Sequence, residues 1–322
     1  MLDSLTNAVP EFTPSGLQVQ PFSQLHNSGN AHPMRLNDFN PANIRVRDQR
    51  GGGGGGGMPG GGIGIVGVLV VLAVAYFTGA DPSQLLSGLQ DVQQGQVQEQ
   101  STGGSDTAES CAVNQYSTEA CAHLASLNET WEPKFLAAGV EFEQPVLNFY
   151  SRSGSAGCGE AQSAMGPFYC PSDRGIYIDT DFFDEMAQRM GAKGDFARAY
   201  VMAHEYGHHV QNLTGLARQV RQLQQQNPDQ DNALQVRMEL QADCYAGIWA
   251  ANNRARIEPG DIEEGMAAAH AVGDDTLMEQ AGRRPVEAAF THGSSAQRMK
   301  WLNIGLETGN EDRCDTFADI LR

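Results

Sequence analysis

The chain has 322 residues, with 39 acidic and 21 basic side chains, a net charge of −18 and an isoelectric point near 4.7. A chain this acidic, with few basic clusters, is not expected to bind nucleic acid or anionic lipid, because both attract positive charge. Hydrophobic residues make up 40%, which suits one core but excludes a polytopic membrane protein, and the 37 glycines lack the Gly-X-Y period of collagen.

Residues 1–60 predict an unfolded cytoplasmic arm. They contain scattered Pro, Asn and Ser without apolar periodicity and include a run of seven glycines from Gly51 to Gly57. Such a segment cannot bury enough apolar surface to offset the entropy lost on ordering. Met34 followed by Arg35 reads as a natural start, which would make residues 1–33 an upstream extension.

Residues 61–80, GGIGIVGVLVVLAVAYFTGA, predict a single transmembrane helix. The segment has no charge and no proline, and twenty helical residues span about 30 Å, the thickness of the hydrocarbon core. The alternatives are a buried core helix or a cleavable signal, and the position after some sixty residues argues against a signal.

Flanking charges predict the orientation of this segment. Arg45, Arg47 and Arg50 precede it, and no Lys or Arg follows until Lys134. The positive-inside rule therefore places the N-terminus in the cytoplasm and the C-terminal part outside the cell membrane, in the periplasm or at the cell surface.

The rest of the chain divides into a stalk and a domain. Residues 81–110 are rich in Gln, Ser and Gly, with five acidic residues and no basic ones, which predicts a flexible stalk. Residues 111–322 carry helical periodicity and aromatic residues, and they are numerous enough for one compact domain.

All six cysteines lie in this last segment, which agrees with an extracytoplasmic location. An even number of cysteines in an oxidising compartment predicts three disulfides, although six cysteines allow fifteen pairings. The alternatives are free buried thiols or a zinc knuckle, but no CxxC spacing occurs. The nearest-neighbour pairing gives Cys111–Cys121, Cys158–Cys170 and Cys244–Cys314.

The domain is expected to be α+β and helix-dominated, with a small sheet. A helix is predicted near 117–130, followed by strand-like runs at 146–150, 167–170 and 176–179. Asp195 is a suitable start and Gly215 a suitable end for the helix that matters most below. Further helices are predicted at 181–190, 195–213, 214–225, 230–252, 260–271 and 295–307.

The most informative motif is His204-Glu205-Tyr206-Gly207-His208, in a helical stretch with apolar neighbours. Positions i and i+4 of a helix share one face, about 6 Å apart, so these two imidazoles can bind one Zn²⁺ at roughly 2.0–2.1 Å each. Glu205 can then reach a water molecule on the metal without binding the metal itself, which suits a general base. The alternative is a surface helix with incidental histidines.

A catalytic zinc needs a third protein ligand and one open position. The metzincin pattern fails, because the positions where it requires glycine and histidine hold Gln211 and Thr214. A later helix offers Glu239 as the third ligand and, one turn on, Asp243 as acceptor for the free ring N–H of His204. The alternative for both carboxylates is a solvated helix face, but that helix is largely apolar, so carboxylates on its inner face would need partners.

Two further histidines have different expected roles. His209 points about 100° away from His208 around the helix and is expected to be structural rather than a ligand. His292 lies in a loop just before a predicted helix, where it could donate a hydrogen bond to the oxyanion of a tetrahedral intermediate. A structural capping role is the alternative for His292.

These features resemble the bacterial neutral zinc metallopeptidase family, whose members have a short cytoplasmic arm, a Gly-rich run, one membrane span and an HExxH domain outside. The resemblance covers residues 34–322 and implies a gluzincin-like, zincin-type protease with one zinc ion per chain and a protein or peptide substrate. The matching blocks, in order, are Met34-Arg35, Gly51–Gly57, Cys158-Gly159, Gly166–Pro171, His204–Gln211, Glu239–Cys244, Gly273–Asp275 and Thr291–Ser294.

The expected reaction is zinc-assisted peptide hydrolysis. Zinc held by His204, His208 and Glu239 would lower the pKa of a water molecule to about 7, and Glu205 would take its proton and pass it to the leaving amine. His292 or a tyrosine would share the oxyanion charge. By analogy with related clans, residues 176–179 are expected to form the sheet edge that pairs with substrate.

Three other interpretations stay open. The domain could be a non-catalytic zinc-binding or protein-binding module anchored in the envelope. It could instead be a soluble protein whose apolar segment at 61–80 does not enter a membrane. It could also be a metallohydrolase that acts on cell-wall amides.

Overall fold

The computed structural model describes residue 36, residues 39–50 and residues 107–320. They belong to one compact unit. Among these residues, no helix combines the length and the apolar character needed to cross a bilayer. The predicted span at 61–80 and nearly all of the predicted stalk lie outside the described residues, as do residues 1–35, 37–38 and 51–60 of the predicted arm.

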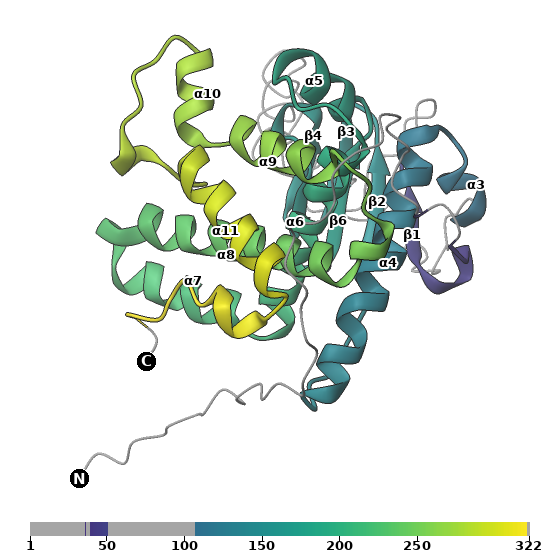
Figure 1. Cartoon of the computed structure of the whole chain (residues 1–322), viewed down its shortest axis with the longest axis horizontal. Helices are drawn as coiled ribbons and strands as arrows, with labels where there is room; N and C mark the ends of the chain where they lie inside the picture. Colours follow the sequence, from purple (N-terminus) through teal and green to yellow (C-terminus); the bar gives the residue numbers. More distant parts are fainter. Residues whose placement is uncertain (1–35, 37–38, 51–106, 321–322) are drawn as a thin grey trace, which may run out of the picture. The chain divides into compact units, whose positions relative to one another are not determined.

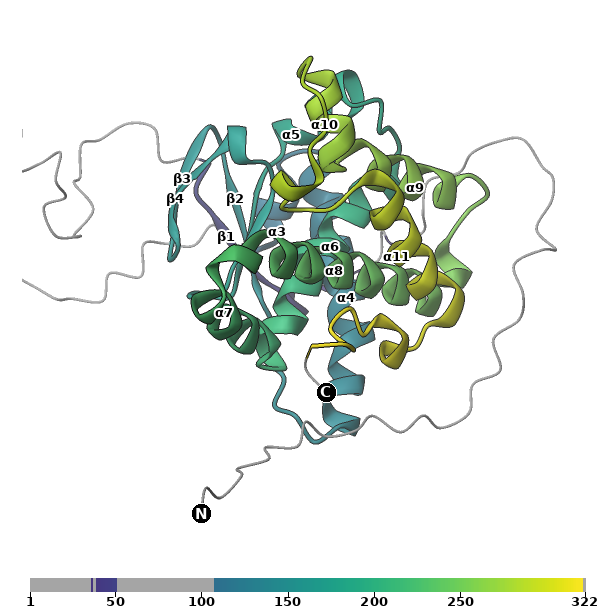
Figure 2. The ribbon, with the colours of Figure 1, turned by 90° about the vertical axis from the view of Figure 1, so that its left-hand side faces the viewer.

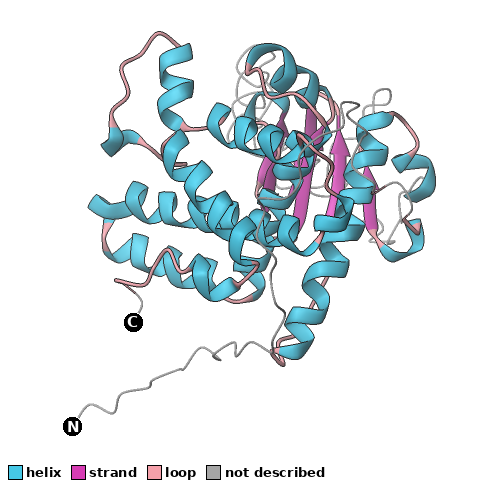
Figure 3. Ribbon diagram, in the orientation of Figure 1, coloured by secondary structure: helices cyan, strands magenta, loops and turns pink. Residues whose placement is uncertain are grey.

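A four-stranded sheet forms one side of this unit (Figure 3). Its order is β1 (Arg45–Asp48), β2 (Val146–Tyr150), β6 (Gly175–Asp179) and β5 (Phe168–Cys170). The first three strands run parallel, and β5 pairs antiparallel with β6. A separate hairpin of β3 (Ser153–Ala156) and β4 (Gly159–Gln162) follows β2 and stands beside the sheet (Figure 2).

The prediction that residues 176–179 form the sheet edge is wrong. They belong to β6, which is paired on both sides, with β2 and with β5. All five residues of β6 are buried, as expected for an apolar strand with neighbours on each side. The edge strand at this side of the sheet is β5.

The prediction of an unfolded arm is wrong for residues 41–50. A short 3₁₀ helix, Pro41–Asn43, leads into β1, which pairs in register with β2 from Arg45 opposite Val146 to Asp48 opposite Phe149. Ile44 is buried in the main core. The sequence does not predict this strand, because it is only four residues long and three of these residues are charged.

Arg50 fastens the end of β1 to the domain. Its guanidinium hydrogen-bonds to Asp48, to the carbonyl of Ser110 and to the hydroxyl of Ser117, and it lies 4.3 Å from the ring centroid of Phe149. The predicted orientation of residues 61–80, and the cell location that follows from it, stay predictions.

Nine α-helices are described, and their arrangement confirms the helix-dominated α+β class (Figure 1). Helix α6 lies next to the sheet and contacts β5, α4, α8 and α9, while α11 packs on α8 and α9. The helices predicted for residues 111–322 are all present, whereas α3 and α10 are additional. Their bounds are α3 Thr107–Cys111, α4 Gln115–Ala137, α5 Asp181–Arg189, α6 Asp195–Leu213, α7 Leu216–Gln226, α8 Asp231–Asn252, α9 Asp261–Ala271, α10 Asp274–Gln280 and α11 Ser295–Thr308.

Local signals account for the two helix boundaries closest to the site. Gly215 adopts φ +80°, a left-handed conformation that favours glycine, and separates α6 from α7. Ser294 and Gln297 form a reciprocal capping box at the start of α11. The nearest-neighbour disulfides are all formed, which confirms that pairing: Cys111–Cys121, Cys158–Cys170 and Cys244–Cys314.

Candidate metal centre

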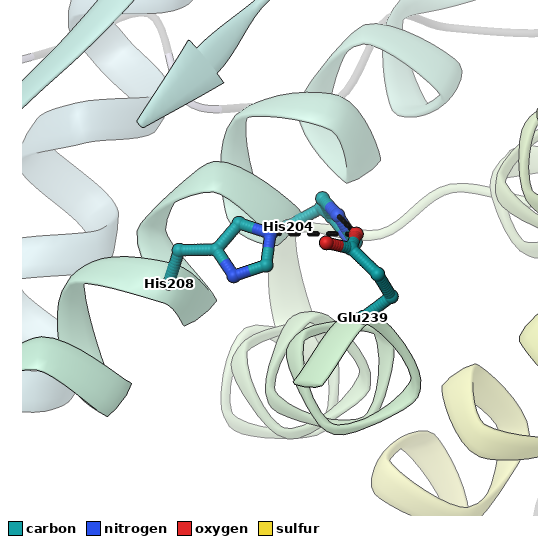
Figure 4. A group of neighbouring side chains, drawn as sticks. All are labelled: His204, His208 and Glu239. Atoms are coloured by element: carbon teal, nitrogen blue, oxygen red, sulfur yellow. Dashed lines mark hydrogen bonds and ion pairs between the residues drawn. The ribbon is translucent and has the colours of Figure 1, made fainter. Parts of the chain in front are cut away.

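Helices α6 and α8 bring His204, His208 and Glu239 together (Figure 4). The two helices cross at close range, because a Cβ at Gly207 would lie 2.8 Å from the Cα of Ala242. Glycine at this position of the HExxH motif therefore lets α8 approach near enough for the Glu239 carboxylate to reach both imidazoles.

The distances between the donor atoms fit one tetrahedral zinc ion. Oε2 of Glu239 lies 3.1 Å from Nε2 of His204 and 3.5 Å from Nε2 of His208. Two ligand atoms at the usual zinc distances and a tetrahedral angle are about 3.3 Å apart. A donor atom from each of the three residues lies within 4.8 Å of the other two.

Each imidazole directs Nε2 at the candidate metal position because its Nδ1 is hydrogen-bonded to another side chain. Nδ1 of His204 lies 2.8 Å from Oδ1 of Asp243, the contact expected from sequence. Nδ1 of His208 lies 2.9 Å from Oε1 of Gln211. A carboxylate and an amide oxygen can only accept here, so each ring, when neutral, carries its proton on Nδ1 and leaves Nε2 free for a metal.

Gln211 is a site residue that the sequence motif does not identify. It is fully buried, and its amide nitrogen donates to the carbonyl of Met238 at 2.8 Å and to Oε1 of Gln241 at 3.0 Å. These two bonds fix which end of the side chain faces His208. The signal available in the sequence was its spacing, since residues i and i+3 share a helix face.

Two more residues that the sequence does not predict, Tyr200 and Arg298, contact the Asp243 carboxylate behind His204. The Tyr200 hydroxyl donates to Oδ1 of Asp243 at 2.6 Å, and the Arg298 guanidinium donates to both oxygens of the same carboxylate. The Asp243 carboxylate that hydrogen-bonds to His204 is therefore itself fixed by Tyr200 of α6 and Arg298 of α11.

Opposite charges shift the pKa values of the candidate ligands. Burial disfavours protonation of His204, but the Asp243 carboxylate outweighs burial and raises its pKa to about 9. Burial likewise disfavours a charged His208, and Glu239 overrides it and raises that pKa. Burial would raise the pKa of Glu239, yet the two histidines hold it well below its usual range. The space between these three side chains therefore strongly favours a positive charge.

The buried charges of the site also suit a divalent cation. Glu205, Glu239 and Asp243 contribute three carboxylates, while Arg298 contributes one guanidinium. Two positive charges are needed to balance this set when both histidines are neutral. One Zn²⁺ would supply them, and its nitrogen and oxygen donors are of the type that zinc prefers.

Glu205 stands beside the ligands without joining them. It is 8% exposed and lines the same pocket as His204 and His208. Among the described residues, none hydrogen-bonds to its carboxylate. Burial raises its pKa, which makes it a better proton acceptor at neutral pH.

The site opens into a pocket of about 580 Å³. Its walls come from β5 and the preceding segment 163–167, from α7, and from the helices that carry the ligands. His292 lines the same pocket with a half-exposed side chain. Asp274 holds its loop by accepting hydrogen bonds from the backbone amides of Thr291, His292 and Gly293, at 2.7, 2.6 and 3.0 Å.

His209 is placed away from the ligands, in agreement with its expected structural role. It is buried, with Nε2 2.7 Å from the carbonyl of Glu143 and Nδ1 3.0 Å from the hydroxyl of Tyr169. The Tyr169 hydroxyl in turn accepts a hydrogen bond from Asn212 at 2.9 Å. Burial lowers the pKa of His209 to about 4, so it is neutral at pH 7 and fastens β5 to α6.

Comparisons with known proteins agree with this geometry. A family model described as "Putative neutral zinc metallopeptidase" matches residues 35–317. The Escherichia coli (strain K12) protein named "Uncharacterized protein YpfJ" is 42% identical over 270 residues, covering 83% of this chain and 91% of that protein. "Uncharacterized protein Rv2575" of Mycobacterium tuberculosis (strain H37Rv) is 43% identical over 206 residues, covering 60% of this chain and 68% of that protein. No solved structure matches the chain.

Proposed function

Because the chain belongs to the neutral zinc metallopeptidase family, we propose that it hydrolyses peptide bonds with one zinc ion held by His204, His208 and Glu239. The observation that carries the proposal is the convergence of these three donors beside Glu205, in the lining of one pocket. The three disulfides favour an oxidising compartment, so we place the activity outside the cytoplasm.

Glu205 is the general base of the proposed reaction. When bound, zinc acidifies a water molecule and polarises the substrate carbonyl. Glu205 takes a proton from the attacking water and passes it to the leaving amine, and its buried setting keeps its pKa raised toward the working pH.

His292 donates a hydrogen bond to the oxyanion that forms on the substrate. The two tyrosines that line the pocket are already engaged, Tyr200 with Asp243 and Tyr169 with His209. The loop of His292 is held by Asp274, so the ring is presented to the pocket without a large loss of entropy on binding.

The substrate binds as an extra strand on β5. The edge strand Phe168–Cys170 borders the pocket and is paired only on its β6 side within the described sheet. An extended peptide can use the remaining backbone groups of such an edge. The tie from Tyr169 through His209 and Asn212 keeps this edge at a fixed distance from α6.

Glu205→Gln in the full chain tests the chemistry. We expect peptidase activity to fall by about 100-fold or more, because general-base catalysis is lost while the fold and the bound zinc remain. His204→Ala and Glu239→Ala should instead bind little zinc, measured by metal analysis of the purified proteins. Equal zinc in wild type and both alanine variants would refute the ligand assignment.

The choice of substrate separates peptide from cell-wall chemistry. Casein and purified peptidoglycan are offered to the wild type and to Glu205→Gln. Hydrolysis of casein by the wild type alone is the expected result. Release of cell-wall fragments without casein cleavage would replace the peptidase by an amide hydrolase of the envelope.

His292→Gln tests the oxyanion contact. We expect kcat to fall by about tenfold to a thousandfold with little change in KM, because the contact strengthens only as negative charge develops. Zinc content should match the wild type, since His292 is not among the three converging donors. An unchanged kcat would leave His292 with a structural role only.

A further inference from the structure

Arg298 is a buried arginine on the first turns of α11, with 3% of its surface exposed. Its Nε donates to Oδ2 of Asp243 at 2.9 Å and its Nη2 donates to Oδ1 at 3.0 Å. The planar fork therefore grips the carboxylate at both oxygens, a geometry that a lysine cannot reproduce. Its Nη1 also donates to the carbonyl of Val272 at 3.2 Å.

The grip leaves the Asp243 carboxylate no freedom to turn. Oδ1 faces three donors, the imidazole of His204, the hydroxyl of Tyr200 and Nη2 of Arg298. Asp243 has no exposed surface, so water does not replace these partners. The same Nη2 lies 3.2 Å from Nδ1 of His204, so the guanidinium also packs against the ring itself.

The charge of Asp243 makes such a partner necessary. A fully buried carboxylate is costly unless an opposite charge and hydrogen bonds compensate it. Among the described residues, Arg298 is the one arginine or lysine that hydrogen-bonds to Asp243. Without it, a buried carboxylate turns away or draws in water, and His204 loses a fixed acceptor.

The position of Arg298 is itself set by tight packing. A Cβ at Gly305 would lie 1.9 Å from the carbonyl oxygen of Cys244, and one at Gly247 would lie 2.2 Å from that of Leu302. These glycines allow α11 to lie directly on α8. The N-terminus of α11 is held by Asp275, which accepts hydrogen bonds from the amide and hydroxyl of Ser295.

We propose that Arg298 is a positioning residue of the zinc site: it locks Asp243, and through Asp243 it fixes the ring of His204 with Nε2 directed at Glu239 and His208. The inference rests on the proposed zinc ligation by His204. Arg298 contacts neither substrate nor the reacting water in this scheme, so its effect is exerted on metal affinity and on the geometry of the ligand set.

Zinc affinity of the full-length Arg298→Ala variant tests this directly. Competition with a chromophoric chelator measures the dissociation constant without any substrate. Loss of an outer partner of a zinc-ligating histidine weakens metal binding by about 10- to 100-fold. We also expect the visible spectrum of the Co²⁺-loaded variant to differ from that of the wild type, because the His204 ring is no longer held.

Chemical rescue separates positioning from general damage. Millimolar guanidinium should restore much of the zinc affinity of Arg298→Ala, because it can occupy the vacated site and pair with Asp243. Urea has a similar shape but no charge and should restore none. Equal rescue by both compounds, or by neither, would overturn the proposal, as would an unchanged zinc dissociation constant.

Arg198→Ala is the matched control. It removes a half-buried arginine from α6, the helix that carries two candidate ligands, but its partners are Glu119 and the carbonyl of Gly194. We expect normal zinc affinity and no response to guanidinium. If Arg298→Ala does not fold, Arg298→Lys serves instead, with intermediate zinc affinity expected because the charge remains and the fork is lost.

The outcome also distinguishes this inference from the proposed function. If His204→Ala binds zinc as tightly as the wild type, the ligand set is wrong and the role of Arg298 falls with it. If His204→Ala loses zinc while Arg298→Ala keeps it, the ligand set stands and only the positioning role is refuted.

Discussion

Asp261 is a buried carboxylic acid at the start of α9, 4% exposed. The carboxyl groups of Asp195 and Glu264 lie with it in a cluster whose oxygens are within 4.8 Å of one another. Burial raises the pKa of Asp261 from 3.8 to about 6, with the amide of Glu258 acting against the shift and Asp195 adding to it. This group therefore makes stability depend on pH away from the metal centre.

Asp261→Asn should stabilise the protein at high pH. The pKa of Asp261 is higher in the folded than in the unfolded state, so the protonated form stabilises the fold. This contribution is complete below about pH 3.8 and is lost as the pH rises through about 6. The neutral variant escapes the loss. We expect the free energy of unfolding to increase by about 1–2 kcal/mol at pH 8. This is less than the full pKa shift of Asp261 would give, because its neighbours Asp195 and Glu264 are only half-buried.

Thermal unfolding at pH 8 and pH 5 measures this difference. Glu263→Gln is the control, because it removes an exposed charge from the same first turn of α9. The control should change the melting temperature little at either pH. A gain for Asp261→Asn that is as large at pH 5 as at pH 8 would contradict the assigned cause.

Spacing in the sequence could predict the inner site but not its supports. His204 and His208 follow from the i, i+4 rule, and Glu239 follows from a carboxylate on an apolar helix. Arg298 could not be found this way, because its partner Asp243 is 55 residues earlier in the chain and on another helix. Its role exists only once α11 has packed on α8.

At the scale of elements, the crossing of α6 and α8 decides whether the third ligand reaches the site. Gly207 and Ala242 form the point of contact, with an added Cβ at Gly207 falling 2.8 Å from the Cα and 3.0 Å from the carbonyl oxygen of Ala242. Both obstacles are backbone atoms, so the helices themselves would have to separate.

Gly207→Ala should therefore weaken both the fold and the site. We expect a loss of about 1–3 kcal/mol in stability, as for other overpacked positions, and zinc binding weaker by about tenfold or more because Glu239 moves away with α8. Thermal unfolding of the metal-free protein and chelator competition measure the two effects separately.

Gly265→Ala is the matched control for this crossing. An added Cβ there would lie 2.6 Å from the ring of Phe196, which also joins α6 to a neighbouring helix but touches no candidate ligand. The control should lose stability and keep its zinc affinity. If Gly207→Ala also kept normal zinc affinity, the crossing would not control the position of Glu239.

The elements that sequence could not predict are the short or irregular ones. The longer helices are long stretches rich in apolar residues, and the central strands are short apolar runs. The hairpin of β3 and β4 consists mostly of Gly, Ser and Ala, and β1 is a charged tetrapeptide before a glycine run. Local pattern likewise does not give the order of strands in the sheet, so it cannot show that β5 rather than β6 lies at the edge.

For the molecule as a whole, β1 makes residues 41–50 part of the folded domain. Leu36 and Ile44 are buried in the same core as α4 and α6. A protein that begins at residue 107 would lack this strand and expose the edge of β2 that it covers. Experiments on the activity should therefore use a chain that includes residues 36–50.

The same pairing predicts that residues 45–50 and the domain share one compartment. Ala42→Cys and Leu136→Cys each place a thiol at an exposed position, one beside β1 and one on α4. All six native cysteines are in disulfides, so each variant has a single free thiol. Both thiols should show the same reactivity with a membrane-impermeant maleimide in spheroplasts. Either both react before lysis or both react only after it.

This comparison does not depend on where the protein resides, because it asks only whether the two positions behave alike. Backbone hydrogen bonds between β1 and β2 cannot form across a bilayer, so a paired β1 requires the same labelling at both sites. Protection of Ala42→Cys in spheroplasts that label Leu136→Cys would mean that residues 61–80 cross the membrane once. The sheet would then lack β1 in the cell, and Arg50 would be released from Ser110 and Phe149 to face the cytoplasm.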